Sequence, residues 1–523
     1  MADEVTSRQL LAKVEAARAA LMDTARDAAV AKRHSQGALT ARERLDVLLD
    51  EGSFRELGAL VQPDRSNALS EGIEAPADGA IAGRGAVNGR SVCVLSQDYT
   101  VLGGSIGTVA DRKMGRLVDQ AADNGQALVL LLEGGGHRIQ DGMNAAHFSA
   151  ASPVFNKLAR LSGWVPTVAA IMGQGFAGPT AYAAMADFVV MIKGKSTMGM
   201  AGPALVKAGT GEELDGQTLG GAARQADGTG IADLAVDTEE ECLAAIAQFL
   251  SYLPENASQE APVIPCDDPI DRRDDALLDL VSANGRQVYD MGRVIRIIAD
   301  RDSVFELKPG YARNIVTCFA RLGGRSVGFI ANQPLRKGGK LDTAACEKAA
   351  HFIALCDAFG LPLVSLIDIP GLAIGSAAED SGIGRRSGRL FYEMAMATVP
   401  LVSVVLRKGY GGGYYAMGGG RAFNATAAFA WPTAEICAMS IEGAVDVAYR
   451  RQVEASSDPL ATRQGMIDDI LQQTGALQAV EDFGLDDVID PRKTREILIE
   501  TFNTCAPRRP DDSPPRRRSI SPI

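Results

Sequence analysis

The sequence predicts an α/β fold built from two tandem copies of one domain. Three observations predict it: short apolar strands alternate with longer helical stretches, one order of strands and glycine turns occurs twice, and a proline- and acid-rich passage lies between the two occurrences. With 523 residues, the chain also exceeds what one hydrophobic core usually organises, so two domains are expected.

The expected strands are apolar runs of six or seven residues, at 91–97, 127–133, 167–172, 326–331, 363–368 and 401–406. The passage YLPENASQEAPVIPCDDPIDRRDD at 252–275 interrupts the alternation. We therefore expect an N-terminal domain over 1–255 and a C-terminal domain over 256–505. The remainder, 506–523, is proline-rich and charged and is expected to lie over the surface or stay mobile.

Before the first strand, apolar residues at helical spacing predict an amphipathic helix over residues 8 to about 33. Thr40 and Glu43 then precede the apolar run LDVLL and match a capping box. In a capping box the hydroxyl and the carboxylate each satisfy a backbone N–H at a helix start. These are structural signals, and no chemistry is assigned to them.

The two copies align to within one residue over their central parts. ALVLLLEGGG leads to VPTVAAIMGQGFAG in the first half, and PLVSLIDIPG leads to VPLVSVVLRKGYGG in the second. The offset is 235 residues at the first strand and 234 at the next. The aligned pairs are Glu133 with Asp368, Gly136 with Gly371, Val165 with Val399 and Gly178 with Gly412.

Gly173, Gly175 and Gly178 fit the G-x-G-x-x-G fingerprint of dinucleotide-binding folds, but the context does not. That site needs an acid about twenty residues further on, where this chain has Met198, and Asp187 comes too early. The second copy does not keep the glycine spacing either. A nucleotide site is therefore disfavoured.

Both copies instead keep small residues between a buried strand and a helix, in the turns EGGGHR, GQGFAGP, DIPGLA and KGYGGGY. Such turns leave backbone N–H groups free to meet an anion. If the two copies pack together, the cleft between them is lined with donors suited to an enolate. Alternatively, the glycines only permit close packing of helix on strand; four turns at matching positions favour the donor interpretation.

Composition excludes several other classes. A net charge of −12 gives no general attraction to nucleic acid or to an anionic membrane. The 8 cysteines are scattered singly and the 4 histidines lack metal-ligand spacing, so no bound metal is expected. An acidic N-terminus and the lack of a long apolar run favour the cytoplasm. No Ser-His-Asp or Cys-His arrangement is evident; Asp187 and Asp368 are interpreted as caps or buried hydrogen-bond partners, and His137 as either a pocket wall or a loop residue.

The sequence resembles the carboxyltransferase β subunit of biotin-dependent acyl-CoA carboxylases, of the propionyl-CoA and methylcrotonyl-CoA carboxylase type. The resemblance runs from about residue 30 to 500 and rests on the order of many motifs. They include SQDYTVLGGSIG (96–107), GGGHRIQDG (134–142), TGEELDGQTLGGA (210–222), ANQPLRKGGKLD (331–342), ATVPLVSVVLRKGYGGGYYAM (397–417) and AWPTAEICAM (430–439).

The resemblance implies two crotonase-like domains, an active site shared between two protomers of a dimer, and commonly a hexamer. It implies that carboxybiotin on a separate carrier subunit gives CO2 to the enolate of an acyl-CoA, with biotin N1 taking the α-proton. The first oxyanion hole carries over to Gly136 and His137, and the second, for biotin, to Gly412 and Gly413. Further implied contacts are Gly411 and Tyr414 on the biotin side, and Gly135, Arg138, Gly175, Phe176, Ala177, Gly178, Pro179 and Tyr415 on the acyl-CoA side.

The chain departs from the family pattern at three positions: His137 and Pro179 replace alanines, and Tyr415 replaces the aspartate of propionyl-CoA carboxylases. The acyl group therefore stays open. No biotinylation motif or biotin carboxylase region is present, so a biotin carboxylase/carrier partner subunit is expected. The alternatives are the carboxyltransferase subunit of a biotin-dependent decarboxylase, a non-catalytic acyl-CoA-binding scaffold and, less favoured, a crotonase-like hydrolase that works without biotin.

Overall fold

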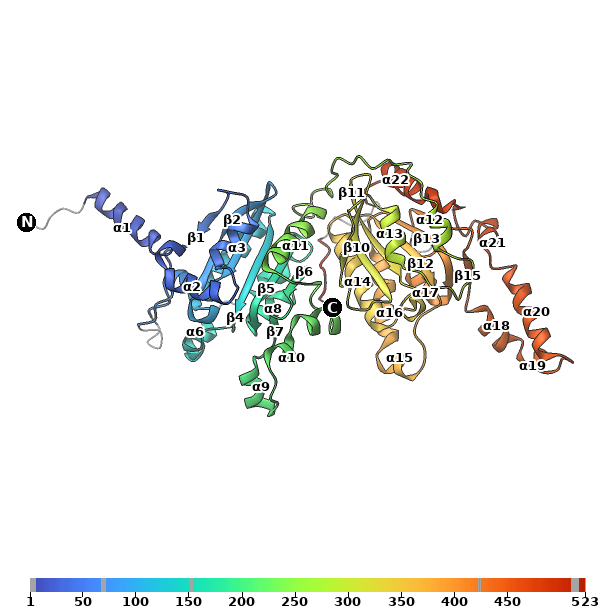
Figure 1. Cartoon of the computed structure of the whole chain (residues 1–523), viewed down its shortest axis with the longest axis horizontal. Coiled ribbons are helices and arrows are strands. Elements are labelled where there is room, and N and C mark those ends of the chain that lie inside the picture. The colour runs from blue at the N-terminus through green and yellow to red at the C-terminus, as the bar shows by residue number, and fades with distance from the viewer. Residues whose placement is uncertain are drawn as a thin grey trace, which may run out of the picture. The chain divides into compact units, whose positions relative to one another are not determined.

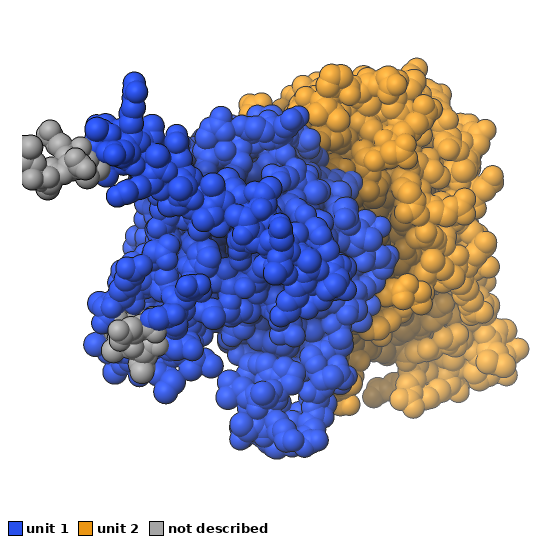
Figure 2. All heavy atoms as spheres, turned by 60° about the vertical axis from the view of Figure 1, so that its left-hand side comes forward, with its two compact units in different colours: residues 1–251, 255–259, 522 blue, residues 252–254, 260–521, 523 orange. Residues whose placement is uncertain are grey.

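In the computed structural model the chain forms two compact units (Figures 1 and 2). Unit 1 comprises residues 1–251, 255–259 and 522, and unit 2 comprises residues 252–254, 260–521 and 523. The division falls inside the proline- and acid-rich passage. The structure describes residues 6–66, 72–150, 154–421, 423, 425–508 and 517–522.

Unit 1 is built on an eight-stranded sheet of order β1-β2-β3-β4-β5-β6-β8, with β7 paired to β5. The first three strands are antiparallel and the rest are parallel. The strands are β1 (Arg55–Leu57), β2 (Ala80–Val87), β3 (Arg90–Gln97), β4 (Ala127–Gly134), β5 (Thr167–Phe176), β6 (Phe188–Ile192), β7 (Thr197–Gly199) and β8 (Leu234–Val236). Every residue of β4 is buried, because a central parallel strand has both faces covered.

Helices of unit 1 pack the apolar residues of the sheet into one core. The longest, α4, buries a stripe at helical spacing that includes Met114, Leu117 and Ala121, which explains its amphipathic pattern. The helices after the N-terminal region are α3 (Ala41–Leu48), α4 (Thr108–Asn124), α5 (Ile139–Gly142), α6 (Ala145–Ala150), α7 (Phe155–Leu161), α8 (Gly178–Ala183), α9 (Pro203–Thr210), α10 (Gly216–Gly220) and α11 (Glu239–Tyr252).

Unit 2 repeats this sheet, with the order β16-β14-β13-β12-β11-β10-β9 and β15 paired to β13. The strands are β9 (Phe305–Leu307), β10 (Ile315–Leu322), β11 (Arg325–Asn332), β12 (Leu363–Ile369), β13 (Leu401–Tyr410), β14 (Ala427–Ala430), β15 (Glu435–Cys437) and β16 (Asp487–Val488). The helices are α12 (Ala276–Leu280), α13 (Met291–Ile298), α14 (Thr343–Ala358), α15 (Ser376–Asp380), α16 (Ile383–Met396), α17 (Gly411–Ala416), α18 (Ile441–Ala448), α19 (Arg450–Glu454), α20 (Pro459–Leu471), α21 (Ala476–Glu481) and α22 (Thr494–Thr504).

The strand registers confirm the internal duplication. Leu128 pairs with Thr167 in unit 1, and Leu363 pairs with Leu401 in unit 2, as the two offsets require. Both central strand pairs also contain a register shift at the same place, just before the glycine turn. All six expected strands are present, as β3, β4, β5, β11, β12 and β13.

The N-terminal region differs from the single helix expected over 8 to 33. It forms α1 (Ser7–Ala19), a 3-10 turn η1 (Asp23–Ala25) and α2 (Asp27–Ser35). The chain leaves helical geometry at Met22, whose backbone is extended, so the apolar spacing spans two helices. The capping box at Thr40 and Glu43 is confirmed, with both reciprocal hydrogen bonds present at the start of α3.

Part of the C-terminal tail has defined contacts with unit 2. The guanidinium of Arg518 lies 2.8 Å from the carboxylate of Asp357, and Ile520 is buried. Residues 509–516 of the predicted mobile tail lie outside the described residues. In the described part of the chain, no helix is long and apolar enough to cross a membrane, and no group of three or more metal-ligating side chains occurs.

Candidate functional site

Two of the predicted glycine turns meet in unit 1. The first, Gly135–Arg138, follows β4, and the second, Phe176–Pro179, joins β5 to α8. A Cβ placed on Gly136 would lie 2.9 Å from the Cβ of Ala177 and 3.5 Å from the amide nitrogen of Gly178. The turns therefore touch, and a glycine at 136 permits it; its φ of +95° also favours glycine.

The backbone of the first turn is held by hydrogen bonds with Ile106. Ile106 donates its amide to the carbonyl of Gly136 over 2.8 Å, and Arg138 donates to the carbonyl of Ile106 over 2.8 Å. Among the described residues, the amides of Gly136, His137 and Gly178 have no protein acceptor. Unit 1 therefore presents free N–H donors at two touching turns, the arrangement that stabilises a developing oxyanion.

The side chain of His137 is partly buried beside this turn. Its ring makes an edge contact with Phe148, with centroids 5.7 Å apart. Burial lowers the pKa of His137 below its ordinary value, so the imidazole is neutral near pH 7. It can line a pocket, but it adds no positive charge to the turn.

Unit 2 holds the matching pair of turns. Leu341 and Leu372 form the same isolated parallel bridge that Ile106 and His137 form in unit 1. A Cβ on Gly413 would lie 3.1 Å from the Cα of Gly371, so these turns also touch. Within the described residues, the amides of Gly412 and Gly413, in the first turn of α17, have no protein acceptor.

Three other predicted contact residues differ in the exposure of their side chains. The side chain of Arg138 is buried, and its guanidinium lies 2.5 Å from Asp78, with which it forms an ion pair. The ring of Tyr414 is also buried and packs over Gly409, Gly419 and Gly420, so it faces the interior of unit 2. Tyr415 is exposed.

The second turn of unit 1 contributes backbone and buried side chains. Gly175 is the last residue but one of β5, the ring of Phe176 packs against Gly199 and Gly202, and Pro179 is buried in the first turn of α8. Ala177 has a φ of +61°, which is unusual for a residue with a side chain. These residues shape the turn, and the amide of Gly178 is the donor it presents.

Sequence reasoning missed the charged groups behind the turns of unit 1. Glu133, at the end of β4, pairs with Arg44 over 2.6 Å and with Arg33 over 2.8 Å, and all three are buried. Asp368 pairs with Arg407 over 2.9 Å in unit 2. The alignment of Glu133 with Asp368 was the available signal. Asp187 is a buried hydrogen-bond partner, as predicted, and accepts from the amide of Thr167.

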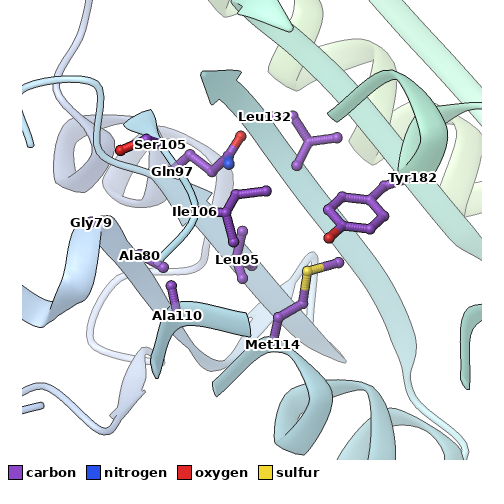
Figure 3. A pocket seen from close by; sticks show the side chains of 10 residues that line it. All are labelled: Gly79, Ala80, Leu95, Gln97, Ser105, Ile106, Ala110, Met114, Leu132 and Tyr182. Carbon is purple, nitrogen blue, oxygen red and sulfur yellow. The ribbon is translucent and has the colours of Figure 1, made fainter. Parts of the chain in front are cut away.

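An apolar pocket lies beside the first turn in unit 1 (Figure 3). The enclosed space is about 10 Å³, roughly enough for one water molecule. Ile106, which hydrogen-bonds the turn, forms one wall, and Tyr182 of α8 lies across from it. The lining residues are Gly79, Ala80, Leu95, Gln97, Ser105, Ile106, Ala110, Met114, Leu132 and Tyr182.

The fold and the paired glycine turns define a class of protein: a tandem α/β protein whose strand-to-helix turns, within the described residues, present backbone amides without a protein acceptor. Comparison with known families gives the class a name. The model of the carboxyl transferase domain matches residues 32–520, and the chain belongs to this family.

Two characterised relatives and one solved structure illustrate the similarity. The chain is 40% identical to the carboxyltransferase subunit of propionyl-CoA carboxylase from Haloferax mediterranei, over 90% of this chain and 91% of that protein. It is 37% identical to the α subunit of methylmalonyl-CoA decarboxylase from Propionigenium modestum, over 91% of each. The crystal structure of transcarboxylase 12S, a hexamer with methylmalonyl-coenzyme A bound, superposes with a TM-score of 0.93 at 36% identity and 99% coverage of both chains.

These comparisons confirm three predictions: the tandem crotonase-like fold, membership of the acyl-CoA carboxylase carboxyltransferase family, and the enzyme class. The predicted roles of individual residues stay predictions.

Proposed function

We propose that this chain transfers a carboxyl group between biotin, held by a partner carrier subunit, and the α or γ carbon of an acyl-CoA. The observation that carries the proposal is the free N–H pair at Gly136 and His137, touching the turn at Gly178. Donors at that place suit the thioester oxygen as it gains charge in the enolate. The similarity to propionyl-CoA carboxylase and transcarboxylase 12S supports a coenzyme A thioester as the substrate.

The second turn pair suits the ureido oxygen of biotin. Among the described residues, a Cβ on Gly412 would come within 4 Å of Leu372 alone, at 3.6 Å, so the backbone there is open to approach. Carboxybiotin, when bound, would supply CO2 and a nitrogen that can accept the α-proton. The amides of Gly412 and Gly413 would hold its ureido oxygen, and those of Gly136 and His137 would hold the thioester oxygen as it gains charge. No side-chain base is required.

The reverse reaction tests the central proposal with this chain alone. The purified full chain is mixed with free biotin and a panel of carboxylated thioesters that includes malonyl-CoA and methylmalonyl-CoA. Their C–C bond breaks, the carboxyl group moves to biotin N1, and the α-carbon takes up a proton. Biotin-dependent loss of the carboxylated thioester is expected with at least one member of the panel. Equal rates with and without biotin, or no loss at all, contradict the proposal.

The decarboxylase alternative has its own support in the similarity to methylmalonyl-CoA decarboxylase. The active-site chemistry is the same, and the partner subunits decide the direction. Co-purification of the chain from its native cells distinguishes the two: a biotin carboxylase partner supports the carboxylase, and a membrane-embedded partner supports the decarboxylase.

A further inference from the structure

In both units a buried carboxylate lies near the end of the strand that leads into the first glycine turn. In β4 the pairing with β5 shifts register between Leu132 and Gly134, so Glu133 is the residue at the irregularity. In β12 the shift lies between Ile367 and Ile369, so Asp368 holds the same place. Ladder hydrogen bonds are disrupted at such a shift, and something else must hold the two strand ends together.

In unit 1 the carboxylate of Glu133 lies directly over the backbone of β5. A Cβ on Gly173 would lie 2.4 Å from Glu133 Oε1, so only glycine leaves room for this carboxylate. Arg44 and Arg33 then approach from α3 and α2. Glu133 thereby links two helices to the strand ends from which both turns project.

In unit 2 the partner comes from the adjacent strand itself. Arg407 of β13 occupies the position that aligns with Gly173, and its guanidinium pairs with Asp368. Asp368 also accepts from the amide of Lys408 over 3.2 Å. The carboxylate therefore ties β12 to β13 where the register shifts.

The backbone at this residue is held in matching ways. The amide of Glu133 donates to the side chain of Gln97 over 2.8 Å, and that of Asp368 donates to Asn332 over 3.2 Å. The carbonyl groups of Glu133 and Asp368 contact Gly104 and Gly339, respectively, too closely for a Cβ. Each carboxylate residue is fixed at its N–H, its C=O and its side chain.

We infer that Glu133 and Asp368 are positioning residues for the proposed reaction, which set the place of the amide donors at Gly136–His137 and Gly412–Gly413. This inference rests on the proposed function. Neither side chain needs to touch a substrate. Each carboxylate holds the ends of two neighbouring strands, and so fixes the positions of the two glycine turns of its unit. A displacement of about 1 Å of the amide donors in these turns costs on the order of 100-fold in rate.

A matched pair of variants tests the role of Glu133. Glu133→Gln and Glu239→Gln each remove one carboxylate charge from Arg44, since Glu239 Oε2 lies 2.8 Å from Arg44 Nε. Glu239 begins α11 and is not part of either turn. In the biotin-dependent assay we expect Glu133→Gln to lower kcat about 10- to 100-fold with KM changed less than about 3-fold, and Glu239→Gln to keep kcat within about 2-fold.

Amide hydrogen exchange gives a readout that needs no activity. In Glu133→Gln the amides of Ile106 and Arg138, which bond the turn, are expected to lose protection, whereas in Glu239→Gln they keep it. The inference is overturned if both variants lose kcat equally and in proportion to their loss of thermal stability. It is also overturned if the amides of Ile106 and Arg138 keep their protection in Glu133→Gln. If the wild-type chain shows no transfer, the proposed function fails and the exchange comparison still decides whether Glu133 positions the turn.

Discussion

Units 1 and 2 keep the same buried carboxylate but obtain its arginine from different places. In unit 2 the arginine is Arg407, on the strand next to Asp368. In unit 1 that strand position is Gly173, and Arg33 and Arg44 come instead from helices about 90 to 100 residues earlier. Both units therefore have a carboxylate at the same position, but the arginine that pairs with it comes from a different element in each. This indicates that the first glycine turn of each unit requires a carboxylate paired with an arginine.

Two further differences lie at equivalent positions. Ala177 has a φ of +61° where unit 2 has Gly411 with a φ of +60°. Asp187 accepts from the amide of Thr167 in unit 1, whereas the hydroxyl of Thr426 accepts from the amide of Leu401 in unit 2. Unit 1 therefore has a strained residue, Ala177, and a buried titratable group, Asp187, at positions where unit 2 has a glycine and a threonine.

The largest expected effect on the free energy of unfolding comes from replacing Arg407, because no second arginine is paired with Asp368 among the described residues. Arg407→Met leaves Asp368 buried without its ion pair and is expected to cost about 3–5 kcal/mol. Arg33→Met in unit 1 is expected to cost about 1–2 kcal/mol, because Arg44 still pairs with Glu133. Urea-unfolding midpoints measure both. Equal losses of unfolding free energy in the two variants would mean that Arg44 does not compensate for the loss of Arg33.

The amide donors of unit 2 can be tested at Gly412. Gly412→Pro removes one N–H and is expected to lower transfer about 100- to 1,000-fold while acyl-CoA affinity stays within about 3-fold. Gly412→Ala is the control, because its Cβ makes ordinary contact with Leu372 at 3.6 Å and the N–H remains. The two variants are compared by kinetics and by calorimetry with acyl-CoA. A similar loss of activity in both contradicts a role for the amide.

Asp187 is expected to make unit 1 sensitive to pH. Burial raises the pKa of Asp187 to about 7, above its value in the unfolded chain, so the folded state prefers the protonated form. Its contribution to stability is therefore complete below about pH 4 and is lost as pH rises through about 7. Asp187→Asn is expected to reduce this pH dependence by an amount on the order of 2 kcal/mol. Thermal unfolding between pH 4.5 and pH 7.5 measures it; identical pH profiles for wild type and variant refute it.

The smallest effect is expected at the strained turn. Ala177→Gly gives unit 1 the residue that unit 2 has at Gly411 and is expected to raise stability by about 1 kcal/mol, because glycine adopts a positive φ without a steric penalty. The thermal midpoint measures the gain. A lower midpoint shows that the alanine methyl group, which packs on Gly136, contributes more than the strain costs.

The fold could be predicted from the sequence because its signals are local. The central strands of both sheets are mostly apolar runs, and the same order of runs and glycines appears twice. The helix expected over 8 to 33 was wrong because its apolar spacing passes through a break at Met22 that no glycine or proline marks.

The site was predicted only in part. Small residues between strand and helix indicated the four turns, but Gly173 was considered only as part of a dinucleotide-binding fingerprint, which its context disfavoured. Its actual neighbour is the Glu133 carboxylate, which is distant in sequence and brought there by strand pairing. The arginines at 33 and 44 could not be assigned to Glu133 without the tertiary structure. Similarly, the burial of the Arg138 and Tyr414 side chains depends on tertiary packing, which the sequence does not show.

The central claim is that backbone amides, not side chains, hold the reacting thioester oxygen. A crystal structure of the full chain with a stable acyl-CoA thioester analogue tests it most directly. We expect the carbonyl oxygen of the analogue about 2.7–3.1 Å from the amide nitrogens of the first turn, at Gly136 and His137. A carbonyl oxygen bound instead by a side chain, or placed away from both turns of unit 1, would contradict the account.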